Sequence, residues 1–379
     1  MSLFLDAHLD LAYLAVKGRN MLGALDVQAG PSPPAAVTLG SLAEGGVRVA
    51  LATIFTEAVP LDRASGKLSP EQYPAGDFDR AGVVGRAQME VYLTWRDMEA
   101  VRLDLRELLR SDAGVGEIRG GMGVSELQAP SLAAILARSR NAAPLHIGIL
   151  IENADPIRSP EELPWWVERG VVAIGMAWAR PGRYAAGNAT PAEADGGLTD
   201  LGRELVRAMD HSRIVHDVSH LSDRSMEALF EATDRPVMAS HSNCRALLND
   251  PANQRHLRDE SIREIVRRGG VIGLNLCRNF IPPQPYAKTD PRPTIDQAVA
   301  HVEHICEIAG HRRAVGLGSD MDGGFGANDL PEGIERPMDL RRLTDALERR
   351  GWSEQEVDGF AHGNFARFLA ENWRERKSA

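Results

Sequence analysis

The chain of 379 residues carries eight short apolar runs, most of them separated by segments with helical spacing. Short apolar runs of this kind are typical of strands that are buried on both faces of a parallel sheet. Apolar side chains three and four residues apart, as at Met226, Leu229 and Phe230, predict amphipathic helices between the runs. The eight expected strands are 3–8, 48–55, 145–151, 171–178, 213–219, 236–240, 270–276 and 314–318.

Eight strand and helix units predict an α/β fold, a closed (β/α)8 TIM barrel. An open, doubly wound sheet is the alternative, but no GxGxxG motif follows the first strand. No linker divides the chain, so we expect one catalytic domain over residues 1–379. We also expect one long helix at 78–111, long loops at 18–45 and 57–77, and a C-terminal helical extension at 338–373 with a break at Gly351.

Composition narrows the class of protein. The net charge of −10 and the absence of a basic cluster argue against nucleic acid or a membrane surface as a partner. Three cysteines without a CxxC motif fit a reducing compartment. No apolar run approaches the roughly 20 residues that a membrane helix needs, and the first residues do not form a signal sequence. We therefore expect a cytoplasmic protein.

Side chains that can bind metal ions stand at the carboxyl ends of five expected strands. Parallel strands joined by helices bring these ends to one face, where α/β active sites lie. Taken singly, each residue is more often structural, and Asp320 could belong to an ordinary turn. The set in strand order is more specific: His8 and Asp10 after the first strand, Glu152 after the third, His220 after the fifth, His241 after the sixth and Asp320 after the eighth.

Imidazole and carboxylate ligands of this kind suit zinc. Five ligands exceed the three that one catalytic zinc ion takes, and they fit two ions about 3.5–4 Å apart that share a carboxylate. Glu152 is the best candidate for the shared ligand, because it lies between the His8 and Asp10 pair and the His220 and His241 pair in strand order. Asp320 then remains for proton transfer. His216 is expected to point into the barrel core, since side chains alternate along a strand.

Six segments in order carry a family resemblance: DAHLDL at 6–11, IENAD at 151–155, DVSHLS at 217–222, SHSN at 240–243, GLGSDMDGG at 316–324 and RRGWSEQEVDGFAHGNFARF at 349–368. With these the chain resembles the membrane (renal) dipeptidase family, peptidase family M19, which is amidohydrolase-like. The resemblance implies two zinc ions: His8 and Asp10 on one, His220 and His241 on the other, and Glu152 on both. It also implies Asp320 as the catalytic aspartate.

The resemblance further implies that Arg255, in QRHLRDE, pairs with the carboxylate of a small dipeptide-like substrate. A guanidinium group suits this role because it can grip a carboxylate with two hydrogen bonds. Two positions depart from the family pattern. Ala177-Trp178 stands where a Thr-His pair is common, and Asn153 follows the bridging glutamate in place of glycine. Trp178 is therefore expected beside the substrate, with one N–H donor where an imidazole is usual.

The resulting expectation is a binuclear zinc dipeptidase that cleaves dipeptides by metal-activated hydroxide, including substrates with a D-configured C-terminal residue. Trp178 keeps an alternative open, a two-metal amidohydrolase that acts on an N-acyl amino acid, a cyclic amide or a lactone. A non-catalytic binding protein is a further alternative, although no ligand of the set is missing. Family likeness alone implies a homodimer.

Overall fold

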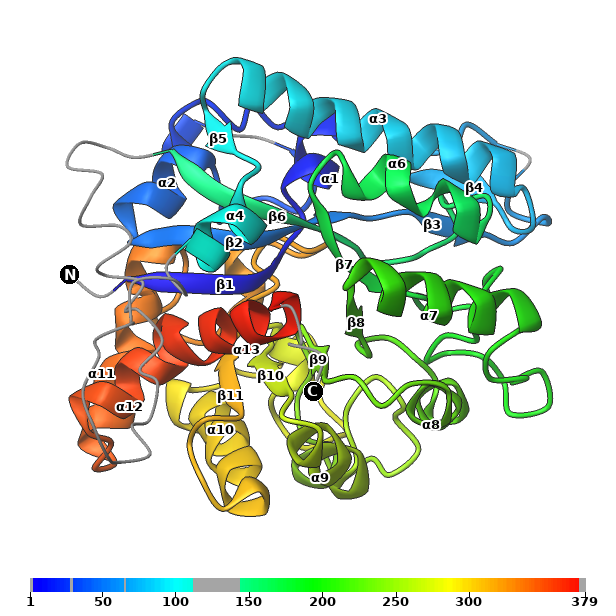
Figure 1. The fold of residues 1–379 in the computed structure, drawn as a ribbon. Coiled ribbons are helices and arrows are strands. Elements are labelled where there is room, and N and C mark those ends of the chain that lie inside the picture. Colours follow the sequence, from blue (N-terminus) through cyan, green and yellow to red (C-terminus); the bar gives the residue numbers. More distant parts are fainter. Residues whose placement is uncertain (1–2, 28–29, 65, 112–143, 375–379) are drawn as a thin grey trace, which may run out of the picture.

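A computed structural model describes residues 3–27, 30–64, 66–111 and 144–374. Eight strands of a nine-stranded parallel sheet follow one another around a nearly closed barrel with helices around it (Figure 1). The predicted (β/α)8 barrel is confirmed, and each of the eight expected runs overlaps a strand. In sheet order the strands are β1 (Phe4–Leu9), β2 (Val47–Ile54), β6 (Leu145–Ile151), β7 (Val171–Gly175), β8 (Val215–Asp217), β9 (Val237–Ala239), β10 (Val271–Leu274) and β11 (Val315–Leu317).

The first and last strands meet through hydrogen bonds just beyond the end of β11. The Ser319 backbone N–H donates to Asp6 Oδ1 at 2.9 Å, and its hydroxyl donates to the same carboxylate. The Asp320 N–H donates to the His8 carbonyl oxygen at 3.2 Å. This seam ties two residues of the predicted metal site to each other before any side-chain ligand is considered.

The single helix expected at 78–111 is wrong. Helix α3 (Phe78–Asp97) stops early, and Glu99 adopts a left-handed backbone with φ of 57°. The next residues form β5 (Val101–Arg102), which pairs with the start of β6, and only then does α4 (Leu105–Ser111) begin. The apolar side chains that suggested one helix are therefore divided between a helix, a strand and a second helix.

The expected long loops contain regular structure. Residues 18–45 include α2 (Leu39–Glu44), which begins at a capping box of Thr38 and Ser41. Residues 57–77 include a small parallel pair, β3 (Glu57–Val59) and β4 (Gln72–Pro74). Both elements were missed because each is shorter than two helical turns or four strand residues, which leaves too little periodicity to read.

The remaining helices cover the barrel, and Thr199 caps α7 by accepting from the Gly202 N–H at 2.9 Å. They are α1 (Leu11–Val16), α6 (Leu163–Val167), α7 (Asp200–Ser212), α8 (Asp223–Ala232), α9 (Asp259–Arg267), α10 (Ile295–Ala309), α11 (Arg341–Arg349), α12 (Glu354–Asp358), the π-helical turn η8 (Gly359–Gly363) and α13 (Asn364–Trp373). Short 3-10 helices are η1 (Leu25–Val27), η3 (Pro160–Glu162), η4 (Arg245–Leu247), η5 (Arg278–Phe280), η6 (Ala327–Asp329) and η7 (Pro337–Leu340).

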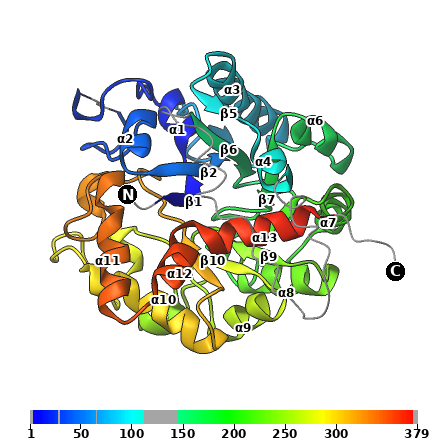
Figure 2. The ribbon, with the colours of Figure 1, turned by 60° about the vertical axis from the view of Figure 1, so that its left-hand side comes forward.

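Helix α13 closes the amino end of the barrel, and Figure 2 shows it crossing that end. Arg213 and Arg235, just before β8 and β9, donate to the carbonyl oxygens of Trp373 and Asn372 at 3.3 and 2.9 Å. Phe365 packs so closely on β11 that a Cβ added at Gly316 would lie 2.6 Å from its ring. The apolar cluster at this end joins α13 and α4 to inward residues of seven strands.

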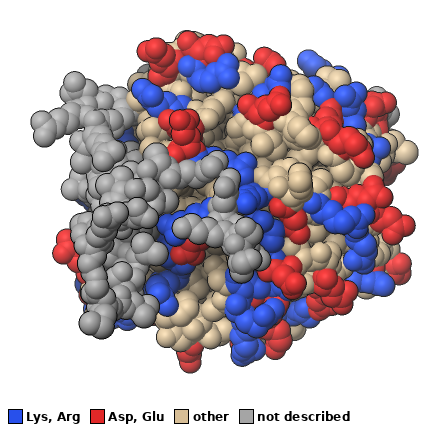
Figure 3. All heavy atoms as spheres, viewed as in Figure 1, with Lys and Arg blue, Asp and Glu red and all other residues tan. Residues whose placement is uncertain are grey.

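The surface carries charges of both signs. On the face in Figure 3, basic and acidic side chains are interspersed. Of the helices among the described residues, none combines the length and the apolar character needed to cross a membrane.

Candidate metal centre at the barrel mouth

Inward side chains of four strands change from apolar to polar as the strands approach their carboxyl ends. Because side chains alternate along a strand, residues two positions apart share a face. The deeper member of each pair belongs to the apolar cluster under α13, and the next inward residue is polar. The pairs are Leu51 and Thr53, Leu150 and Glu152, Val215 and Asp217, and Met238 and Ser240.

The six predicted ligand and proton-transfer residues lie together at this end, and each is at most 8% exposed. They form three overlapping groups whose ligand atoms lie within 4.8 Å of one another: His8, Asp10 and Glu152; Glu152, His220 and His241; and His8, His241 and Asp320. The structure therefore brings together every residue of the predicted metal set.

Glu152 stands between His8 and Asp10 on one side and His220 and His241 on the other. Its Oε2 lies 3.6 Å from His8 Nε2, and Asp10 Oδ1 is also 3.6 Å from that nitrogen. Its Oε1 lies 3.1 Å from His220 Nε2 and 3.7 Å from His241 Nε2. Each oxygen of one carboxylate thus faces a different ligand group, which is the arrangement expected of a shared ligand in a two-metal site.

Hydrogen bonds at the Nδ1 atoms fix the tautomers of the three histidines. The Ser240 hydroxyl donates its one hydrogen to Asp217 Oδ2 at 2.5 Å. It must therefore accept from the Nδ1–H groups of His8, at 3.2 Å, and His241, at 2.8 Å. Asn188 Oδ1 accepts from His220 Nδ1 at 3.2 Å. We assign all three histidines the tautomer that leaves Nε2 as a bare lone pair, the form that binds metal ions.

The resulting site consists of acceptor atoms that face one another with no donor between them in the described structure. Whether a metal ion fits the site depends on these atoms. His8 Nε2 and Glu152 Oε2 are buried and lack a hydrogen-bond partner among the described residues. The Nε2 atoms of His220 and His241 face each other at 3.0 Å. Buried acceptors that converge in this way are costly unless a cation lies between them. The residues fit divalent metal ions.

Burial controls the charges of the site. It raises the pKa of Glu152 to about 8, with a further contribution from Asp217, while Arg255 lowers it. Burial also raises the pKa of Asp10 to about 7 and that of Asp320 to about 8. The imidazoles of His220 and His241 have pKa values well below the usual range for the same reason. Burial therefore favours the neutral forms of these carboxyl and imidazole groups. Bound metal ions would instead favour the ionised carboxylates.

Local backbone geometry places several of these side chains. Asp10 precedes α1, but its side chain makes no capping hydrogen bond and instead accepts from the Thr53 hydroxyl. His220 and Asp320 are left-handed, with φ of 67° and 58°. This conformation is uncommon for residues other than glycine and is concentrated at functional sites. His220 follows β8 after a turn and is not in the strand.

The expectation that His216 points into the barrel core is wrong. Its neighbours Val215 and Asp217 take the inward positions, so His216 faces the helix layer, where Nε2 lies 2.8 Å from Asp210 Oδ1 of α7. Strand β8 ends at Asp217, and the turn between Asp217 and His220 breaks the alternation of inward and outward side chains. The direction of His220 therefore does not predict the direction of His216.

The residues predicted to meet the substrate flank the metal groups. Arg255 is 6% exposed, and within the described structure its guanidinium hydrogen-bonds to two neutral groups, the Ser242 hydroxyl at 3.2 Å and the His241 carbonyl oxygen at 3.0 Å. The partly exposed Trp178 ring lies 5.8 Å from the His220 ring, centre to centre. Asp320 Oδ2 accepts from the Asn275 amide at 2.9 Å, so one oxygen is held in place.

Five supporting residues were missed from the sequence: Thr53, Asn188, Asp217, Ser240 and Asn275. Three of them carry a usable signal, because Thr53, Asp217 and Ser240 stand two positions beyond an inward apolar residue near a strand end. Asn188 and Asn275 lie beyond the ends of β7 and β10, and nothing in their local sequence marks them.

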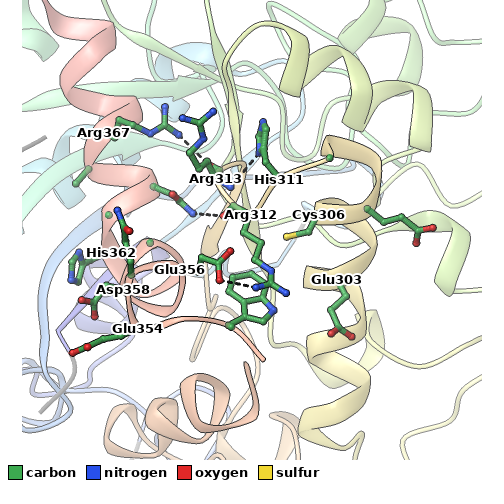
Figure 4. Close-up of a pocket in the computed structure, with 18 residues that line it drawn as sticks. Glu303, Cys306, His311, Arg312, Arg313, Glu354, Glu356, Asp358, His362 and Arg367 are labelled. Carbon is green, nitrogen blue, oxygen red and sulfur yellow. Dashed lines mark hydrogen bonds and ion pairs between the residues drawn. The ribbon is translucent and has the colours of Figure 1, made fainter. Parts of the chain in front are cut away.

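A hollow of about 1440 Å³ lies elsewhere, between α10 and the segment from α12 to α13 (Figure 4). Its charged groups largely satisfy one another. Arg312 binds Glu356 at 2.7 Å and stacks over Trp352, while Arg367 donates to the Arg313 carbonyl oxygen. All the metal-type groups found in the described part of the chain are at the barrel mouth, so we place the chemistry there.

A (β/α)8 barrel with adjoining histidine and carboxylate groups at the carboxyl ends of its strands has the architecture of a metal-dependent hydrolase. The chain matches the membrane dipeptidase family, peptidase family M19, over residues 1–379, and therefore belongs to that family. It is an enzyme of the hydrolase class.

Individual relatives agree with the family match. An uncharacterized dipeptidase of Schizosaccharomyces pombe is 31% identical over 191 residues, which is 49% of this chain and 42% of that protein. The chain thus spans less than half the length of this curated relative. Dipeptidase AC, a solved metallo peptidase of family M19, aligns with a TM-score of 0.75 at 21% identity, covering 98% of this chain and 99% of that one. A solved metallo peptidase from Rhodobacter sphaeroides aligns with a TM-score of 0.71 at 21% identity, covering 97% and 99%.

Proposed function

We propose that this enzyme is a binuclear zinc dipeptidase. The observation that carries the proposal is Glu152, whose two oxygens face two separate histidine groups. His8 and Asp10 would hold one ion, His220 and His241 the other, and Glu152 both. Nitrogen and oxygen donors without sulfur suit zinc, although other divalent ions share this preference. Two such ions would lower the pKa of a bound water and polarise the substrate carbonyl.

Two further side chains, Asp320 and Arg255, would carry out proton transfer and substrate binding. Asp320 has one oxygen held by Asn275 and lies within the same group as His8 and His241. These contacts support our assignment of Asp320 as the group that would take a proton and deliver it to the leaving amine. Its membership of that group also makes it a possible further ligand. Arg255, a buried cation that hydrogen-bonds to two neutral groups in the described structure, would bind the substrate carboxylate.

One related structure supports the substrate class. The Rhodobacter sphaeroides metallo peptidase is liganded with a phosphinate mimic of the dipeptide L-Ala-D-Ala. We extend this to the present chain as part of the proposal, including acceptance of a D-configured C-terminal residue. A cytoplasmic location, a homodimer and a single domain over residues 1–379 stay predictions.

The test joins metal content to activity. The purified protein should contain about two zinc ions per chain and should cleave L-Ala-L-Ala and L-Ala-D-Ala in a reaction that a chelator abolishes and zinc restores. Two metal ions with no cleavage of any dipeptide would leave the metal site and reject the substrate. No metal after reconstitution would reject the ligand assignment itself.

Trp178 favours a second candidate, hydrolysis of an N-acyl amino acid, a cyclic amide or a lactone by the same centre. An indole ring beside His220 offers an apolar face that does not require a charged amine. The same assay with N-acetylated amino acids and lactones separates the two candidates.

A further inference from the structure

Three aromatic side chains form a continuous row on one side of the metal groups. Tyr13 of α1 contacts Phe55 edge to face, with ring centres 5.6 Å apart, and Phe55 contacts Trp178 in the same way at 5.1 Å. Trp178 in turn lies 5.8 Å from the ring of His220. We call Tyr13, Phe55 and Trp178 the aromatic wall.

The wall is rigid where it meets the metal groups. The Trp178 carbonyl oxygen accepts from the Asn188 N–H at 3.3 Å, and Asn188 also holds the His220 ring. The backbone of Gly187 passes so close to Trp178 that an added Cβ would lie 1.9 Å from its carbonyl oxygen. Phe55 packs edge to face against the indole ring. These contacts position the ring before any ligand binds.

The wall and the buried guanidinium lie on opposite sides of the mouth. In a barrel of eight strands, those four places apart in the sheet order face each other. Phe55 follows β2, and Arg255 bonds to residues just after β9, which is four strands away. Trp178 follows β7, four strands from β11 and Asp320. The metal groups occupy the space between.

We propose that the aromatic wall binds the side chain of the residue on the amino side of the scissile bond, and that the enzyme prefers dipeptides with a large apolar, above all aromatic, N-terminal residue. The proposal rests on the dipeptidase function proposed above. Two residues span only about 7 Å, so a carboxylate at Arg255 and a carbonyl at the metal groups leave the N-terminal side chain on the far side. Trp178 is partly exposed there and contacts the buried ring of Phe55. Edge-to-face packing of this kind favours another ring.

The size of the preference follows from buried area. Moving a phenylalanine or leucine side chain from water onto this wall, compared with alanine, should raise kcat/KM by at least about 10-fold. The C-terminal residue should show a weaker dependence, because its carboxylate and not its side chain is held by Arg255.

The experiment compares two series of dipeptides on the zinc-loaded protein, Xaa-Ala and Ala-Xaa, where Xaa is Gly, Ala, Leu or Phe. Phe-Ala should exceed Ala-Ala by at least about 10-fold, and Trp178→Ala should remove most of that difference. Trp178→Phe, which keeps an aromatic ring, should retain the preference. Trp165→Ala is the matched control, since Trp165 lies on α6 between Arg86 and Arg169 and touches no metal group. Metal content is measured for every variant.

The outcomes separate this proposal from the one beneath it. Cleavage of no dipeptide would overturn the dipeptidase function and the wall together. Cleavage at equal rates across Xaa-Ala, a preference confined to Ala-Xaa, or a Phe-Ala preference that survives in a metal-replete Trp178→Ala variant would overturn the wall alone.

Discussion

At the amino end of the barrel, α13 packs Phe365 and Phe368 against inward residues of the strands, and these side chains are at most 1% exposed. At the carboxyl end, the same strands carry buried histidines and carboxylates, two of whose polar atoms, His8 Nε2 and Glu152 Oε2, lack a partner in the described structure. Only about two residues along each strand separate the two regions. One end is apolar and closely packed, and the other is polar, with acceptor atoms that converge on one another.

The difference indicates that the two ends of each strand have different roles, stability at the amino end and the metal site at the carboxyl end. Apolar packing at the amino end supplies stability, because removing buried rings leaves cavities that the fold cannot fill. The carboxyl end gathers like charges and unpaired acceptors, which lower stability unless cations bind. Substitutions at the two ends should therefore separate loss of folding from loss of metal and activity.

Glu152→Gln should have the largest effect on function. The amide keeps the shape but loses the charge that both ligand groups share, so metal content should fall and dipeptide hydrolysis should drop by at least about 1000-fold, beyond the 10–100-fold typical of outer-shell partners. Metal analysis and steady-state kinetics measure both. Glu162→Gln is the control, since Glu162 binds Arg86 and Arg158 away from the mouth. A variant with full metal content and full activity would remove Glu152 from the centre.

Asp320→Asn should separate proton transfer from metal binding. If Asp320 carries the proton, the variant should keep its zinc but lose about 10²–10⁴-fold in kcat. Loss of zinc in parallel with activity would instead make Asp320 a ligand, as its grouping with His8 and His241 allows. Unchanged turnover would exclude it from the mechanism.

Phe365→Ala tests the other end. Phe365 is 1% exposed and fills the space above Gly316, so its truncation should lower the free energy of unfolding by about 3–5 kcal/mol. Zinc per folded chain and kcat at a temperature below unfolding should stay near those of the parent. Urea unfolding supplies the first quantity, and Met98→Ala, at an exposed position, supplies the matched control. A kcat that falls with stability would show that the two ends are not independent.

The eight strands and the ligand set could be predicted because both leave strong local signals, apolar runs and polar residues at their ends. Which side chains of each strand point into the barrel could not be predicted. The three residues of β8, Val-His-Asp, are all buried, so its sequence does not alternate in a way that shows that Val215 and not His216 points inward. The end of α3 was equally hidden, since Val101 pairs with Leu145, a contact 44 residues away.

Ser240→Ala probes a residue that the sequence did not indicate. Its hydroxyl sets the tautomers of two ligands on different strands, so its loss should weaken zinc affinity by about 10–100-fold. Competition with a zinc-binding dye measures the change directly, without reference to activity. Ser242→Ala, which removes a hydroxyl bonded to Arg255, should leave zinc affinity unchanged. Equal affinity in the parent and Ser240→Ala would reject the tautomer assignment.

The last expected effect is a pH dependence of the metal-free protein. Glu152, Asp10 and Asp320 have folded pKa values of about 8, 7 and 8, while unfolded carboxyls titrate near 4. Between these limits the folded chain binds more protons than the unfolded chain, so its stability must fall as pH rises. The buried histidines act in the opposite direction, but only below about pH 6.5, where unfolded histidines become charged.

The window from about pH 6.5 to 8.5 therefore reports the carboxyls at the mouth. Thermal unfolding in chelator should show Tm falling across this window, whereas zinc, which needs the ionised carboxylates, should stabilise the protein more at the higher pH. Glu152→Gln removes one titrating group and should flatten the fall in chelator, while Phe365→Ala should lower Tm equally at every pH. A Tm in chelator that is constant or rises over this range would mean that the carboxyls at the mouth are already ionised without a cation.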